Sequence, residues 1–81
     1  MDEQEYERNE AAYRRMKETI QQSYPKGTFV GIFNEQIVVA TPNFRELDPL
    51  LTAQGLDPRR VLVVEAGIDY PEYATIYPFT V

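Results

Sequence analysis

The chain has 81 residues, of which 43% are hydrophobic and 26% charged, and its net charge is −5. A chain of this length has room for one hydrophobic core, so residues 1–81 are predicted to form a single domain. It contains neither cysteine nor histidine, which excludes disulfides, thiolate-bound metals and the commonest general base. We therefore expect no cofactor and no metal. The acidic balance disfavours nucleic acid, whose backbone is bound by Lys and Arg.

Two further features concern location. The longest apolar runs are far shorter than a membrane-spanning helix, so no membrane association is expected. A small secreted domain usually needs disulfide bonds. The sequence therefore predicts a cytoplasmic protein.

Residues 3–23 are predicted to form an amphipathic helix, because apolar side chains recur at helical spacing on one face. Acidic residues crowd its first turns, where they favour the positive end of the helix dipole. Pro25 and Gly27 end it. A helix with so narrow an apolar face is not stable alone in water. It must therefore dock either on the sheet of its own chain or on a partner chain. The stripe consists of Tyr6, Tyr13, Met16 and Ile20.

A β-hairpin is expected over residues 28–41, with strands at 28–33 and 36–41 and a tight turn at Asn34-Glu35. The first strand is apolar on both faces, which is typical of a central strand covered on both sides. This pattern favours docking of the first helix on the sheet. Gly31, in the middle of that strand, indicates close packing, a bulge or the approach of a ligand to the backbone.

A short helix is predicted over residues 43–55, where apolar residues repeat at helical spacing after a candidate N-cap at Asn43. Pro49 interrupts this pattern because it lacks an amide hydrogen. We expect an irregularity near residue 48, with Asp48 acting as a second N-cap.

Two strands follow. Residues 61–65 are the most apolar and are predicted to form a central strand, and residues 73–77 resemble an edge strand because Pro78 cannot donate to a ladder. The chain is therefore predicted to be an α+β domain, in which a small sheet is covered by helices.

Part of the pattern resembles a known family. The relevant segments are Lys26–Gly31, with the sequence Lys-Gly-Thr-Phe-Val-Gly, then Gln36–Ala40 and Gln54–Val64, the last of which includes Pro58-Arg59-Arg60-Val61-Leu62-Val63-Val64. Together they resemble the bacterial domain-of-unknown-function family 5678. The resemblance covers about half of the chain and consists mostly of turn and strand positions. It implies a hairpin–helix–strand core and a bacterial origin, and it supplies no catalytic residue.

Catalysis would have to use carboxylates. Glu65 and Asp69 lie at the end of a predicted strand and in the loop that follows it, where functional residues often gather, and Tyr70 is adjacent. These three residues are the basis of an alternative hypothesis, a small-molecule-binding or carboxylate-dependent hydrolytic domain. A solvent-exposed strand end and a turn explain the same residues, so the chain is predicted not to be an enzyme.

The first hypothesis is a non-catalytic protein–protein interaction or accessory module that forms a homodimer or binds another protein. Its basis is the number of tyrosines, which bring apolar area and a polar tip to interfaces. The candidate surface combines the first helix with the C-terminal segment. Its residues are Tyr6, Tyr13, Met16, Ile20, Tyr70, Tyr73, Tyr77 and Phe79.

Overall fold

The computed structural model describes residues 2–70. Helix α1 (Glu3–Ser23) is followed by strands β1 (Phe29–Phe33) and β2 (Gln36–Thr41), a 3₁₀ turn, helix α2 (Leu47–Ala53), a second 3₁₀ turn and strand β3 (Leu62–Glu65). The fold is α+β, as expected. The predicted strand at 73–77 lies outside the described residues.

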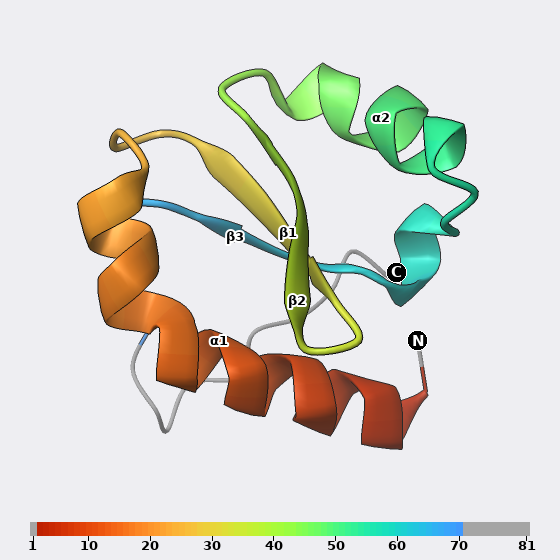
Figure 1. Cartoon of the computed structure of the whole chain (residues 1–81), viewed down its shortest axis with the longest axis horizontal. Helices are drawn as coiled ribbons and strands as arrows, with labels where there is room; N and C mark the ends of the chain where they lie inside the picture. Colours follow the sequence, from red (N-terminus) through yellow and green to blue (C-terminus); the bar gives the residue numbers. More distant parts are fainter. Residues whose placement is uncertain (1, 71–81) are drawn as a thin grey trace.

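The sheet has the order β2-β1-β3, and both neighbours run antiparallel to β1 (Figure 1). Strand β1 is central, in agreement with its two apolar faces. Strand β3 was expected to be central as well, but among the described strands it lies at an edge. The strand expected beside it would be 73–77.

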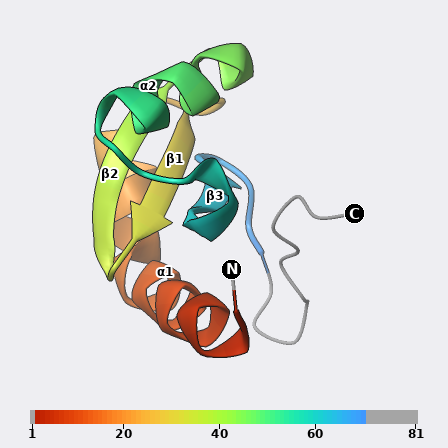
Figure 2. The ribbon, with the colours of Figure 1, turned by 90° about the vertical axis from the view of Figure 1, so that its right-hand side faces the viewer.

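The two helices lie on opposite faces of the sheet (Figure 2). Val30 and Ile32 of β1 pack with α1, whereas Phe29 and Phe33 lie with the α2 cluster. Alternate residues of a strand point to opposite faces. Because β1 carries apolar side chains on both of its faces, it contributes to the core on each side of the sheet. The first helix thus docks on its own sheet.

The N-terminus of α1 carries a complete capping box. The Asp2 side chain accepts a hydrogen bond from the Glu5 amide at 2.7 Å, and Glu5 accepts one from the Asp2 amide in return. This satisfies two amides that have no partner within the helix. Because the first turn is fixed in this way, the Glu5 carboxylate has a defined position.

The hairpin turn lies at Asn34-Glu35, where it was predicted. Both residues have positive φ, 52° and 65°, as a two-residue turn of the type that matches strand twist requires. Asn tolerates this conformation and Glu does so at a cost. Glu35 compensates in part by pairing with Arg15 of α1 at 3.0 Å.

A bulge follows Gly31. Gly31 pairs with Val39 and Ile32 pairs with Ile37, so Val38 has no opposite residue on β1. A Cβ atom on Gly31 would lie 2.6 Å from Cγ1 of Val39 and 3.0 Å from Cγ1 of Val61. Close packing between strands and a bulge therefore both explain the glycine.

The irregularity expected near residue 48 is present, but the prediction that Asp48 caps a new helix is wrong. Asn43 caps a 3₁₀ turn at Phe44–Glu46, and α2 begins directly afterwards at Leu47. Pro49 therefore falls in the first turn of α2, where its missing amide hydrogen costs no intrahelical bond. Asp48 lies inside that turn.

Candidate functional site

The tyrosine stripe of α1 does not form an exposed surface. Tyr13 and Ile20 each expose only 1% of their surface and belong to a core cluster with Leu62 and Val64 of β3. The prediction that these two residues offer a partner surface is therefore corrected, because the sheet of the same chain already covers them. Helical spacing identifies the apolar face of a helix but not what covers it.

The other predicted surface residues divide into two groups. Tyr6, Met16 and Tyr70 are half-buried against the same cluster. The Tyr70 ring lies edge-on to Tyr13 with ring centres 5.8 Å apart, and its hydroxyl accepts a hydrogen bond from the Glu65 amide at 3.2 Å. Tyr73, Tyr77 and Phe79 lie outside the described residues.

The Tyr13 phenol is an unusual buried group. Its hydroxyl is inaccessible and forms no well-shaped hydrogen bond with the described residues. Burial raises the pKa of Tyr13 above its ordinary value, whereas Lys17, Arg14 and the Tyr70 backbone act in the opposite direction. An unsatisfied buried hydroxyl costs free energy, so this ring contributes to the core through its apolar area.

Glu65, Asp69 and Tyr70, on which the hydrolytic hypothesis rests, hold the loop after β3 in place. Asp69 pairs with Lys17 of α1, and the carbonyl of Tyr70 accepts from Arg14. Gln21 adds a further link, because its side chain accepts from the Gly67 amide at 2.9 Å. Across residues 2–70 no three Asp or Glu side chains form a metal-binding group. The geometry supports a structural role for this loop.

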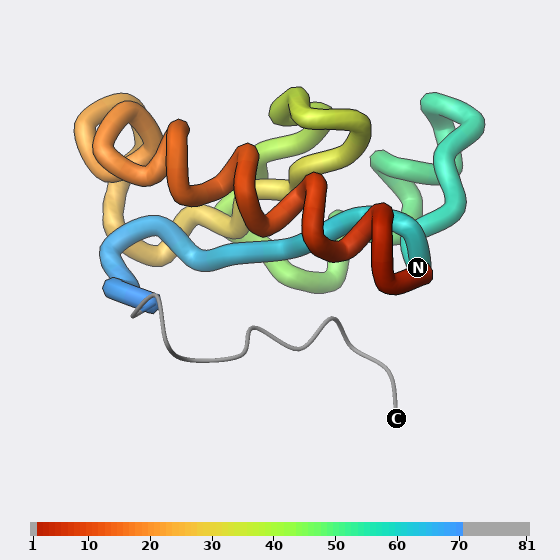
Figure 3. The backbone as a smooth tube through the Cα atoms, turned by 90° about the horizontal axis from the view of Figure 1, so that it is seen from below, coloured from red at the N-terminus to blue at the C-terminus, as the bar shows by residue number. Residues whose placement is uncertain are grey.

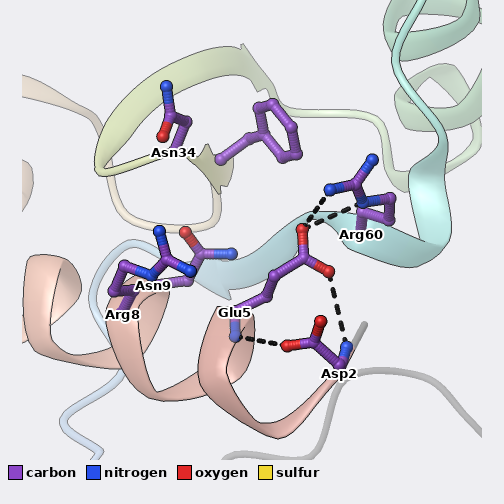
Figure 4. A pocket seen from close by; sticks show the side chains of 7 residues that line it. Asp2, Glu5, Arg8, Asn9, Asn34 and Arg60 are labelled. Atoms are coloured by element: carbon purple, nitrogen blue, oxygen red, sulfur yellow. Dashed lines mark hydrogen bonds and ion pairs between the residues drawn. The ribbon is translucent and has the colours of Figure 1, made fainter.

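A polar recess of about 240 Å³ lies between the start of α1, the hairpin turn and the entry to β3 (Figure 4). Glu5 points across it to Arg60, whose Nε donates to the carboxylate at 2.9 Å. Arg60 also lies over the Phe33 ring, 5.6 Å from its centre. The full lining is Asp2, Glu5, Arg8, Asn9, Phe33, Asn34 and Arg60.

The ion pair determines the electrostatics of this recess. The Arg60 guanidinium is the main cause that lowers the pKa of Glu5 below its ordinary value, so the carboxylate is ionised at neutral pH. An ionised carboxylate bonded to arginine is a poor general acid. The observed contacts therefore favour a bridge between α1 and β3, and they give the hydrolytic hypothesis no support.

Within residues 2–70, the α2 side of the sheet is less completely covered than the α1 side. Helix α2 has only 7 residues, against 21 for α1, and Phe44 and Leu50 expose 48% and 41% of their surface. The Phe44 ring packs edge-on against Phe29, with centres 5.3 Å apart. We call these apolar residues and their half-buried neighbours the α2-side surface, which consists of Phe29, Phe33, Phe44, Leu50 and Val63.

The two edges of the described sheet differ. On β2 the bulge interrupts the ladder, and the Gln54 side chain donates to the Val38 carbonyl at 2.7 Å. Bulges and occupied backbone groups protect an edge from pairing with other strands. Strand β3 lies in a segment that runs beside α1 (Figure 3), and it has no strand on its second edge within residues 2–70.

Neither the α2-side surface nor the difference between the edges was predicted from the sequence. Two sequence signals could have indicated the α2-side surface, namely Pro49 and the short apolar stripe around it. Both indicate a short helix, and a short helix cannot cover a sheet face. Comparisons with protein-family models, curated proteins and solved structures find no match. Over the part of the chain that is described, no helix has the length and apolar character needed to cross a membrane.

Proposed function

We propose that this chain is a non-catalytic protein–protein interaction or accessory module of a bacterial cytoplasm, and that it acts as a homodimer or with another protein. The observation that carries the proposal is the α2-side surface. Apolar side chains that are exposed in a contiguous patch are typical of interaction sites. The aromatic pair Phe29–Phe44 lies within this surface, and aromatic residues are enriched at interfaces.

The charge balance supports the same class of partner. The net charge of −5 opposes binding to the phosphate backbone of nucleic acids, whereas an apolar surface needs only an apolar partner. The bacterial origin rests on the resemblance to domain-of-unknown-function family 5678 and remains a prediction. The cytoplasmic location rests on the absence of cysteine and is likewise a prediction.

The test is a capture experiment with matched variants. The full chain, immobilised through a tag, is incubated with lysate of the source cells, and bound proteins are quantified by mass spectrometry. The double variant Phe44→Ser, Leu50→Ser removes the exposed apolar groups. The control Glu18→Ser, Thr19→Ser changes two exposed positions of α1.

The proposal predicts at least one partner, or a second copy of the chain, whose binding is lost in the double variant and kept in the control. Circular dichroism verifies that both variants are folded. Binding profiles that are identical for all three proteins, together with a monomeric mass at tens of micromolar, would refute the proposed interaction module.

A further inference from the structure

We draw no further inference here: the strongest candidate, the polar recess between the start of α1, the hairpin turn and the entry to β3, carries nothing because Glu5 and Arg60 already pair with each other across it and Asp2 already caps α1, so that it belongs to the bridge between α1 and β3 described above.

Discussion

The guanidinium of Arg60 holds the carboxylate of Glu5 across 55 positions of sequence and thereby ties the first turn of α1 to the start of β3. The same Glu5 side chain completes the capping box of α1. One carboxylate thus links the end of a helix to the entry of a strand.

This link predicts an acid-dependent loss of stability. The pKa of Glu5 is lowered from its ordinary value of 4.5 in the folded chain, so its stabilising contribution is present above that value. The contribution is lost as the pH falls through the lower, folded-state pKa. Glu5→Gln should therefore lower the melting temperature at pH 7 and flatten its decline below pH 4.5. Thermal melts at several pH values, with Glu18→Gln as control, measure this, and parallel curves for Glu5→Gln and the unchanged chain would contradict it.

Gly31→Ala is predicted to destabilise the sheet by about 1–3 kcal/mol, the usual cost of overpacking a core. The added methyl group would lie 2.6 Å from Cγ1 of Val39. Val39→Ala removes that atom, so the double variant should lose less than the sum of the two single changes. Urea unfolding of the two single variants and the double variant completes the cycle. If the losses of unfolding free energy add strictly, the contact with Val39 is not what destabilises Gly31→Ala.

Tyr13→Phe is predicted to leave stability unchanged or to raise it by about 1 kcal/mol, because it removes a buried hydroxyl without a good partner. The Tyr6 hydroxyl donates to Glu10 at 3.2 Å, so the matched change Tyr6→Phe should destabilise slightly. Urea unfolding at pH 7 compares them. A clear loss in Tyr13→Phe would mean that the hydroxyl is hydrogen-bonded in solution.

The same phenol predicts an alkaline effect. Burial raises the pKa of Tyr13 above its ordinary value of 10.0, so the unfolded chain releases this proton at lower pH than the folded chain. Stability is therefore intact below pH 10 and declines as the pH rises through the folded-state value. Tyr13→Phe should reduce this decline, which thermal melts between pH 8 and 11 can measure. If the melting temperature falls with pH equally steeply in Tyr13→Phe, the buried phenol is not the cause of the decline.

Glu35→Gly is predicted to stabilise the hairpin. Glu35 has a φ of 65°, which costs a residue with a side chain about 1 kcal/mol and glycine little. Loss of the exposed pair with Arg15 offsets part of this gain. Asn34→Gly should gain less, because asparagine already tolerates the conformation. Melting temperatures of both variants test the order, and a larger gain at position 34 would contradict it.

The local structure could be predicted because its causes lie close together in the sequence. Asn34-Glu35 defines the hairpin turn, and Phe29 to Phe33 carry apolar groups on both faces, which correctly indicated helical cover on each side. The second helix was predicted less well. Whether Pro49 breaks a helix depends on where that helix begins, and the 3₁₀ turn at Phe44–Glu46 moves the beginning to Leu47.

The candidate surfaces could not be predicted in the same way. Tyr13 and Ile20 show the same spacing whether a partner or the chain's own sheet covers them. The pairs Glu5–Arg60 and Lys17–Asp69 join residues more than 50 positions apart, and no local pattern links them. The half-covered α2 side arises from the difference in length between two helices on opposite faces, which becomes visible only once the layers are assembled.

The packing of α1 on β3 also constrains the order of folding during synthesis. Tyr13 and Ile20 leave the ribosome roughly 40 to 50 residues before Leu62 and Val64, which belong to the same core cluster. An isolated helix with so few apolar contacts is marginal in water, and contacts between distant segments form slowly. The part of the α1 apolar stripe that packs against Leu62 and Val64 therefore stays exposed to chaperones and other nascent chains until β3 has been made. The acidic first turns of α1 keep this exposed segment charged.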